Sequence, residues 1–356
     1  MTNPIRVCLV GAGRAGQVHA ESLVQHVPQG QLVALVDQNA PALEKAGERF
    51  GIEARFSSVE EAAAHIAFDA VVITTPTFTH REIAKAAAAL GKHILCEKPM
   101  ALSLEECDEM IAAADQNGVI LQIGFMRRFD PDFEAAAARI EAGEIGRPMV
   151  IKSLTHGPGL PPAWARDLPT SNGMLAEVNS HDWDTVRWLA YSNPERVYTE
   201  VSNFKGEKHG VDTPHFYDTA LVNVRFESGT LASISGICPC DYGYDARVEI
   251  VGEKGLLQIG DFRGQAIVVC TNRDHGLVTP IYRTWPERFG SAYVREMKHF
   301  LECVRSGSKP RVSGQDGRWA VASVLAATTS FLEERSVRLS EVLEKHSQDV
   351  KVEVAR

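Results

Sequence analysis

Three glycines near the N-terminus constrain the fold more than any other feature. Gly11, Gly13 and Gly16 have the spacing G-x-G-x-x-G, directly after the apolar run Ile5–Val10 and at the start of a helical stretch. In such a segment the first glycine permits a tight turn, the second lets a pyrophosphate approach the backbone, and the third lets helix and strand pack closely. The helix N-terminus adds unpaired N–H groups and the positive end of its dipole. The segment, with its inner residues 14 and 15 (Arg14 and Ala15), therefore predicts a dinucleotide-binding turn.

An acidic residue follows at the distance expected for this kind of turn. Asp37 stands at the end of the next apolar run, Leu32–Val36, and is followed by Gln38 and Asn39. A carboxylate there accepts hydrogen bonds from ribose hydroxyls and repels a 2′-phosphate. We therefore expect NAD rather than NADP. The alternative is a structural glycine turn with a helix-capping aspartate.

The first third of the chain alternates between strand and helix patterns, which is typical of βαβ units and a parallel sheet. The expected strands are Ile5–Val10, Leu32–Val36, Ala70–Thr74, His93–Cys96 and Val119–Ile123. The expected helices are Arg14–His26, Pro41–Phe50, Val59–His65, Thr79–Leu90 and Leu104–Asn117, the last with a capping box of Ser103 and Glu106. This pattern predicts an α/β fold that begins with a Rossmann domain, a doubly wound parallel sheet over residues 1–124.

From Gly124 onward the pattern changes to strands in series. The expected strands are Met149–Thr155, Arg196–Val201, Thr219–Phe226, Thr230–Ile237, Ala246–Val251, Leu256–Ile259 and Ala266–Thr271. The expected helices are Asp132–Ala142, Met174–Ala190, Ser291–Arg305 and Gly314–Arg335, of which the last two finish the chain. Residues 125–356 are thus expected to form an α+β domain with a large, mostly antiparallel open sheet. Because a single core rarely exceeds about 250–300 residues, two domains suit the length.

Charge and composition exclude several kinds of partner. The formal net charge is −9, whereas a nucleic acid or an anionic membrane surface needs a basic protein face. The seven cysteines favour buried, reduced thiols, and Cys238 and Cys240 lack the second pair of a metal site, so no metal is expected. No apolar run is long enough for a membrane span or a signal peptide. We therefore expect a cytoplasmic protein.

Two segments stand at the carboxyl ends of expected parallel strands, where ligands bind in such sheets. One contains Thr75, Pro76 and His80, and the other contains Glu97 and Lys98. We expect both to line the cofactor site. A lysine beside the cofactor can hydrogen-bond a reacting hydroxyl. On this segment alone, an exposed structural lysine is the commoner alternative.

The expected helix Met174–Ala190 carries an acid and an imidazole at helical spacing. Glu177, His181, Asp184 and Trp188 share one of its faces. A glutamate four residues before a histidine can orient the imidazole or balance its charge, as a general base near neutral pH requires. The alternative is a surface histidine with an acidic neighbour.

Taken together, these segments resemble the Gfo/Idh/MocA family of oxidoreductases, named after glucose–fructose oxidoreductase, inositol dehydrogenase and rhizopine catabolism. The similar segments are GAGRAGQVHA, TPTFTHREIA, CEKPMALSLEE, GFMRRFDPDF, HDWDTVRWL, YGYDARVEIVGEKGLL, RFGSAYVREMKHFLE and DGRWAVASVLAATTSF. They cover nearly the whole chain, and within the family they are most similar to inositol 2-dehydrogenases. The resemblance implies a homodimer or homotetramer that associates through the open face of the second sheet.

The resemblance also implies residue roles. Lys98 matches the lysine that contacts both the nicotinamide ribose and the substrate, and His181 matches the usual proton acceptor. Arg127, His156 and Tyr242 match positions that face the substrate in inositol dehydrogenases.

Two departures from the family pattern bear on the substrate. The family usually has aspartate four residues before the histidine, whereas this chain has Glu177, which keeps the carboxylate on a longer arm. Inositol dehydrogenases often follow their first substrate-facing histidine with Arg-Asn. Here His156 is followed by Gly-Pro-Gly and by a loop that carries Trp164 and Arg166. We expect this loop to reshape the substrate pocket.

The predicted reaction is the NAD-dependent oxidation of a secondary hydroxyl of a cyclic polyol or pyranose sugar. His181 accepts the hydroxyl proton, Glu177 stabilises the imidazolium, and Lys98 orients and polarises the oxygen while the hydride passes to the nicotinamide. Two alternatives remain open. One is an NAD-dependent glycosidase that oxidises its substrate transiently. The other is a non-catalytic NAD-binding sensor.

Overall fold

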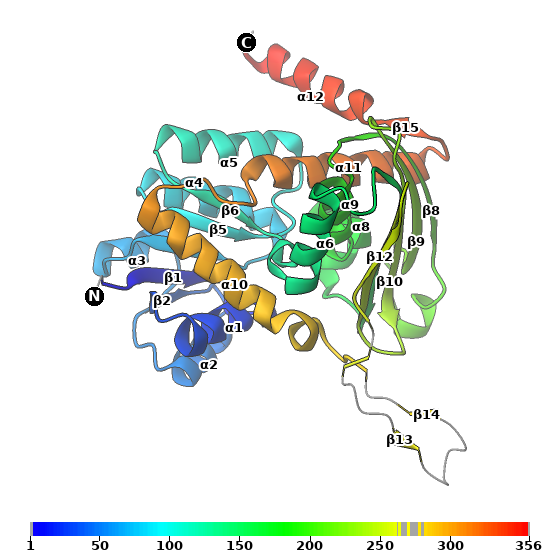
Figure 1. Ribbon diagram of the computed structural model, residues 1–356. Helices are drawn as coiled ribbons and strands as arrows, with labels where there is room; N and C mark the ends of the chain where they lie inside the picture. The colour runs from blue at the N-terminus through cyan, green and yellow to red at the C-terminus, as the bar shows by residue number, and fades with distance from the viewer. Residues whose placement is uncertain (1–2, 262, 265–268, 271–276, 279–280, 355–356) are drawn as a thin grey trace. The chain divides into compact units, whose positions relative to one another are not determined.

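The computed structural model describes residues 3–261, 263–264, 269–270, 277–278 and 281–354 (Figure 1). The chain forms two compact units, and neither is a single contiguous segment. The first consists mainly of Met1–Asp130 and Ser291–Val321, and the second of Pro131–Gly290 and Ala322–Val352. These units differ from the expected division into residues 1–124 and 125–356, because a late helix returns to complete the first core.

The first unit has the topology that the sequence predicted. Its six strands lie in the order β3-β2-β1-β4-β5-β6, and every neighbouring pair is parallel. The strands are β1 (Ile5–Val10), β2 (Gly30–Val36), β3 (Arg55–Phe56), β4 (Ala70–Ile73), β5 (His93–Glu97) and β6 (Leu121–Gly124). The short strand β3 was not expected. Because the chain winds in opposite directions on either side of β1, the carboxyl ends of β1 and β4 form the switch point where ligands bind.

Helices cover both faces of this sheet, with α1 and α2 on one side and α4 and α5 on the other (Figure 1). The helices are α1 (Arg14–Glu21), α2 (Ala40–Phe50), α3 (Val59–His65), α4 (His80–Ala89) and α5 (Leu104–Gln116), and a short π-helical turn, Ser22–His26, extends α1. Ser103 caps α5 as predicted, since its hydroxyl accepts from the Glu106 amide, whereas the Glu106 side chain accepts from the Leu102 amide and not from that of Ser103.

Part of α10 (Trp285–Ser306) completes the core of the first unit. Met297, Phe300 and Leu301 are buried in the same apolar cluster as Val7 and Leu23. An isolated amphipathic helix must bury its apolar face against another element. This packing explains why the first unit includes a segment that lies far along the sequence.

The second unit is built on a seven-stranded, mostly antiparallel sheet in the order β12-β11-β7-β10-β9-β8-β15, in which only β7 and β10 run parallel. Its strands are β7 (Pro148–Pro158), β8 (Pro194–Ser202), β9 (Thr219–Phe226), β10 (Leu231–Cys240), β11 (Asp245–Gly252), β12 (Leu256–Ile259) and β15 (Val337–Arg338). The expected strand Ala266–Thr271 falls largely outside the described residues. Of this range the structure describes only β13 (Val269–Cys270), which pairs with β14 (Leu277–Val278).

Helices of the second unit pack on one face of this sheet. Figure 1 shows α8 (Gly173–Glu177) and α9 (Ser180–Ala190) beside the strands, and α9 contacts β7 and β10. The unit also contains α6 (Pro131–Glu141) and the short α7 (Leu168–Ser171). The prediction of one helix over Met174–Ala190 was wrong.

The break between α8 and α9 has a cause in the sheet. The side chain of Asn179 is fully buried and donates to Asp182 at 2.8 Å. It lies so close to β10 that a Cβ atom at Gly236 would stand 2.1 Å from its amide oxygen. The chain turns at Val178 and Asn179 to seat this amide, and the helix ends there and restarts at Ser180.

The end of the chain also differs from expectation. α11 (Gly314–Leu332) is followed by β15 and by a further helix, α12 (Leu339–Val354), so the prediction that two helices finish the chain was wrong. β15 pairs with β8 at the edge of the sheet, and α12 begins directly after it. None of the helices in the described ranges is both long enough and apolar enough to cross a membrane.

Candidate active site

The glycine turn is shaped by close contacts within the first unit. Gly11 has φ +101°, and a Cβ atom there would lie 2.8 Å from the backbone of Thr74. A Cβ atom at Gly16 would lie only 1.9 Å from the carbonyl oxygen of Gly11. Both positions therefore exclude any side chain, as predicted for the tight turn and for the close packing of helix and strand.

Gly13 differs from its two neighbours. A Cβ atom at Gly13 would have no described atom within 4 Å, so the packing of the chain does not require glycine there. Gly13 is the residue before α1, and no described side chain caps the first N–H groups of that helix. Open space beside unpaired amide donors at a helix N-terminus suits a pyrophosphate, so the chain's own residues fit a bound dinucleotide.

Asp37 lies beside this turn at the end of β2. Its carboxylate accepts from the Ala12 amide at 2.6 Å and from the Asn39 amide at 2.7 Å. These two bonds fix the side chain between the glycine turn and α2. Because each carboxylate oxygen can accept a second hydrogen bond, the group retains capacity for ribose hydroxyls.

The segment that follows β4 is tied to the segment that follows β5. His80 is buried, and its two ring nitrogens lie 2.9 Å from the carbonyl oxygens of Thr75 and Pro99. Burial lowers the pKa of His80, against the opposing effect of these carbonyls. Thr75 and Pro76 are partly exposed at the strand end, where the sequence placed them in the cofactor site.

Glu97 and Lys98 end β5 with opposite exposures. Glu97 is buried, and its carboxylate accepts from the Lys98 amide at 3.1 Å and lies 2.8 Å from Nε2 of His19. Lys98 itself is partly exposed, although Cys96, Pro99 and Met100 around it are buried. The side chain of Lys98 is thus partly exposed at the end of the strand, and the buried carboxylate of Glu97 accepts a hydrogen bond from its backbone amide.

In the second unit, α9 is fixed to the sheet beside His181. The carboxylate of Asp182 is fully buried and accepts from the hydroxyls of Ser153 and Thr155, both at 2.6 Å, and from the Asn179 amide. His181 is itself 6% exposed. Glu177 ends α8, so it does not share one continuous helix with His181, and the predicted i, i+4 geometry is broken by the turn between them.

The remaining predicted substrate residues differ in burial and in local structure. Arg127 lies in a short 3₁₀ turn, Met126–Phe129, and is 1% exposed. Trp164 lies in the 3₁₀ turn Ala163–Arg166, and its carbonyl accepts from the Thr170 hydroxyl at 2.6 Å. The loop that carries Trp164 is therefore ordered by its own hydrogen bonds.

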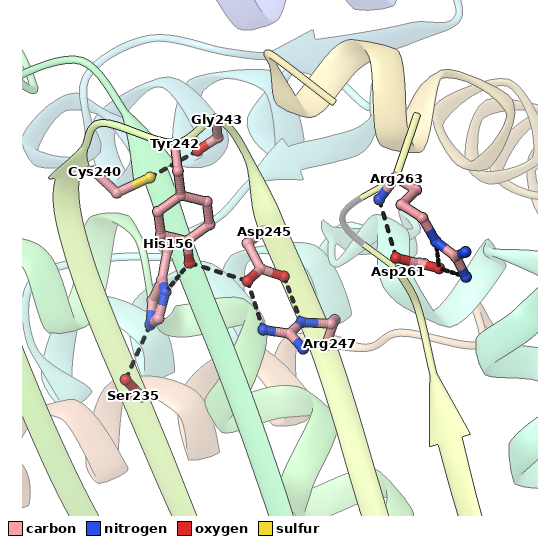
Figure 2. A network of polar contacts seen from close by, with 9 residues as sticks. All are labelled: His156, Ser235, Cys240, Tyr242, Gly243, Asp245, Arg247, Asp261 and Arg263. Carbon is pink, nitrogen blue, oxygen red and sulfur yellow. Dashed lines mark hydrogen bonds and ion pairs between the residues drawn. The ribbon is translucent and has the colours of Figure 1, made fainter. Parts of the chain in front are cut away.

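His156 and Tyr242 belong to a network on the open face of the second sheet (Figure 2). His156 contacts the Tyr242 hydroxyl and the Ser235 hydroxyl, and Tyr242 donates to Asp245 at 3.0 Å. Arg247 grips the same Asp245 with two hydrogen bonds of 2.7 and 2.8 Å.

Strand alternation shows which face this network occupies. Thr155 points to Asp182 on α9, so the next residue, His156, points to the opposite face. The structure thus brings His156 and Tyr242 together but separates both from the α9 side of the sheet. Burial lowers the pKa of His156 and, with the charge of Asp245, raises that of Tyr242.

Sequence reasoning missed two buried clusters. One is the set around Asp182, whose partners stand on a distant strand. The other consists of His19, Glu97 and Glu296, whose nitrogen and carboxyl oxygens lie within 4.8 Å of one another. Asp182 and Glu296 stand among other polar residues in the sequence, so nothing local distinguishes them or pairs them with their distant partners.

Two family models match this chain. An oxidoreductase family with an NAD-binding Rossmann fold matches residues 5–125, and the GFO/IDH/MocA C-terminal domain matches residues 133–258. The chain belongs to the Gfo/Idh/MocA family. As a Gfo/Idh/MocA protein it is an oxidoreductase that uses NAD, which confirms the predicted family, fold class and cofactor.

Individual Gfo/Idh/MocA relatives align over almost their full length. The scyllo-inositol 2-dehydrogenase (NAD(+)) of Bacillus subtilis is 35% identical over 345 residues, which cover 95% of this chain and 97% of that protein. The myo-inositol 2-dehydrogenase of Thermotoga maritima is 34% identical over 339 residues, covering 95% and 100%. The structure of scyllo-inositol dehydrogenase from Lactobacillus casei with bound NAD(H) and scyllo-inositol superposes with a TM-score of 0.86 at 25% identity, covering 95% and 100%.

Proposed function

We propose that this chain oxidises a secondary hydroxyl of a cyclic polyol of the inositol class. The proposal is supported by relatives named inositol 2-dehydrogenases that match it over nearly their whole length. The structural observation that carries the proposal is Lys98, which is partly exposed among buried neighbours. It stands at the end of β5, the strand next to β4, and the switch point lies between β4 and β1. An ammonium group at that place suits a substrate made of hydroxyls.

The proposed mechanism divides the work among three side chains. NAD, when bound, supplies the acceptor for the hydride. His181 takes the proton of the reacting hydroxyl on a ring nitrogen, and Glu177 stabilises the resulting positive charge. Lys98 donates a hydrogen bond to the same oxygen, which orients it and favours loss of its proton.

Asp182 supports this assignment for His181. A general base must be held within hydrogen-bond reach of the proton that it removes. Two hydrogen bonds of Asp182 fix the first turn of α9 to β7, a third joins it to Asn179 at the start of the helix, and His181 is the residue beside it. The backbone of the proposed base is therefore anchored to the sheet.

Arg127 and Trp164 remain our proposed substrate contacts, since a guanidinium and an indole N–H supply donors for a ring that carries many hydroxyls. His156 and Tyr242, which the resemblance also implied as contacts, lie on the face of the sheet opposite α9, so we do not assign them to the same substrate. The ordered loop around Trp164 replaces the Arg-Asn pair that often follows this histidine in inositol dehydrogenases. We propose that this loop sets the choice among inositol isomers.

The test is NADH absorbance after the protein is mixed with NAD and a panel of inositols, aldoses and anhydrosugars, with NADP in parallel. We expect NADH with a subset of the inositols. Lys98→Ala and His181→Ala should each lower kcat by about 100- to 10,000-fold, the usual contribution of a positioned acid–base group. Lys45→Ala, on an exposed part of α2, is the matched control for removal of a lysine.

Other results would favour the alternatives. Release of nitrophenol from a glycoside without net NADH would indicate a glycosidase that oxidises its substrate transiently. Tight NAD binding with no turnover on any substrate would indicate a sensor. A Lys98→Ala protein that keeps most of its turnover would refute the role of the lysine.

We also propose that the open face of the second sheet binds a second copy of the chain. Leu221, Leu231 and Leu256 point outward from this face and are 58%, 47% and 52% exposed. Exposed apolar side chains gathered on one sheet face are typical of protein–protein contacts. Sedimentation should show that Leu221→Asp with Leu231→Asp shifts the protein toward monomer, and an unchanged mass would contradict the assignment.

A further inference from the structure

A buried polar cluster lies behind the lysine-bearing strand end in the first unit. It consists of His19 on α1, Glu97 at the end of β5 and Glu296 on α10. His19 and Glu296 are 0% exposed and Glu97 is 5% exposed. Buried charged groups are expensive unless they are paired, so three such side chains in one place need a physical explanation.

Glu97 is the hub of this cluster. One carboxylate oxygen lies 2.8 Å from Nε2 of His19, and the other accepts from the amide of Lys98 at 3.1 Å. The next strand closes over it, since a Cβ atom at Gly124 would stand 3.1 Å from the Glu97 carboxyl carbon. The glutamate is thus held on both sides, and it holds the peptide that carries the lysine.

His19 is fixed in turn by its own surroundings. Its ring meets the ring of Tyr293 edge to face, with centroids 5.3 Å apart. It stands on α1, the helix that begins at the glycine turn. Through His19 and Glu97, the helix whose N-terminus suits a pyrophosphate is connected to the peptide of Lys98.

Glu296 behaves differently from Glu97. Neither of its carboxyl oxygens has a hydrogen-bond partner in the part of the chain that the structure describes. Burial and the nearby charge of Glu97 raise the pKa of Glu296 well above its ordinary value. Two carboxylates this close cannot both ionise in a dry interior, so Glu296 carries a proton.

A shared metal ion fits the cluster less well. His19 and Glu97 meet at 2.8 Å, which is the distance of a direct hydrogen bond between charged or strongly polar groups. Nε2 of His19 is therefore already engaged with a carboxylate oxygen. A protonated Glu296 removes the excess charge without an ion.

We propose that Glu97 is a positioning residue for Lys98, clamped by His19, with Glu296 as its uncharged neighbour. This inference rests on the proposed function of Lys98. It extends that function by assigning to the first unit the residues that hold the lysine in place. Glu97 acts on the reaction through the Lys98 peptide and does not need to touch the substrate.

The experiment follows Lys98 directly as well as through turnover. Reductive ¹³C-methylation labels the lysines, and the Lys98 signal is assigned in the NMR spectrum by its loss in Lys98→Arg. In unmethylated protein, Glu97→Gln should lower kcat for the polyol by about 10- to 100-fold, because small misplacements of a reacting group have effects of this size. The polyol KM should change less. In methylated protein, Glu97→Gln should shift and broaden the Lys98 signal.

Three further variants separate positioning from folding. His19→Leu should reproduce the signal change of Glu97→Gln, whereas His19→Gln, whose amide can still donate to Glu97, should restore the original signal. Glu296→Gln mimics a protonated acid and should leave the Lys98 signal in place, with kcat reduced by about threefold or less, since uncharged isosteric changes are tolerated best. Melting temperatures show which variants remain folded.

Each negative result has a distinct meaning. If the wild-type protein oxidises polyols but Glu97→Gln leaves the Lys98 signal and kcat unchanged, the positioning role is refuted. If no polyol is oxidised, the proposed function fails, while the NMR signal still reports whether Glu97 holds the lysine. A divalent metal that co-purifies with the wild type and is lost in Glu296→Gln would overturn the assignment of Glu296 as an uncharged neighbour.

Discussion

The two units build their functional groups in different ways. In the first unit, the turn at Gly11–Gly16 presents backbone amides, and the spacing of its glycines is a short sequence motif, although Gly11 packs against the distant Thr74. In the second unit, the segment around His181 depends on Asp182 and on hydroxyls from β7, almost thirty positions away, as the separation of 29 between Ser153 and Asp182 shows. The backbone site can be recognised from a local motif in the sequence, whereas the side-chain site is visible only in the tertiary fold.

This difference affects what a substitution does. A backbone site tolerates most side-chain changes, but a Cβ atom cannot be added where two segments of backbone are in close contact. A side-chain site depends on complete pairing of buried groups, because an unpaired buried donor or acceptor is strongly unfavourable. Substitutions at four places in the chain test this contrast.

Removal of the Asp182 carboxylate should be the most destabilising change. Asp182→Ala leaves the hydroxyls of Ser153 and Thr155 and the Asn179 amide without their buried acceptor. Breaking a buried, charged network of this kind lowers the free energy of unfolding by about 3–5 kcal/mol. Chemical denaturation measures the loss, and Asp212→Ala, an exposed aspartate in the same unit, is the control. A loss no greater than that of the control would show that α9 is held by other contacts.

The same contrast explains how much of the fold could be predicted. The bounds of β1, β9 and β12 agree with the sequence expectation, because alternation and turn residues are local signals. The parallel, doubly wound character of the first sheet also follows from the alternating strands and helices, although the short β3 was not expected. The glycine turn and Asp37 could be placed together because their spacing is typical of dinucleotide-binding folds, although the contact itself joins residues 25 positions apart.

Non-local contacts account for the failures. The helix over Met174–Ala190 breaks because Asn179 must fit against Gly236, and no property of the helix sequence shows that contact. The return of α10 to the first unit depends on Met297 and Phe300 finding the Rossmann core. His156 was expected at the substrate from family resemblance. Its position on the face opposite α9 follows only from the register of β7.

Alanine at Gly16 and at Gly13 should separate packing from ligand binding within the first unit. Gly16→Ala places a Cβ atom 1.9 Å from a carbonyl oxygen, and overpacking of this kind lowers stability by about 1–3 kcal/mol. Gly13→Ala meets no described atom and its backbone is extended, so its melting temperature should stay the same or rise slightly. Both should weaken NADH binding, measured by fluorescence titration. A Gly13→Ala protein with unchanged NADH affinity would remove Gly13 from the cofactor site.

Asp37 combines features of both kinds of site, since its side chain accepts a hydrogen bond from the backbone of the glycine turn. Asp37→Asn removes the charge but keeps one acceptor for the Ala12 or Asn39 amide. We expect the preference for NAD over NADP to fall by about 10- to 100-fold, which corresponds to one or two steps of about 1.4 kcal/mol. The ratio of kcat/KM for the two cofactors measures this change, with Gln38→Ala as the neutral neighbouring control. An unaltered ratio would assign the discrimination to another residue.

His80 should give the smallest effect on stability. It is an exception to the difference between the units, because it is a buried side chain that connects two strand ends in the first unit. Its pKa in the folded protein is below the ordinary value of 6.5, chiefly through burial. The unfolded chain therefore binds more protons as the pH falls below about 6.5, so stability declines there and the loss levels off once the pH passes the folded pKa. The free energy of unfolding measured from pH 8 to 5 should show this decline in the wild type. The slope should be shallower in His80→Gln, and equal slopes in the two proteins would mean that other groups cause the acid sensitivity.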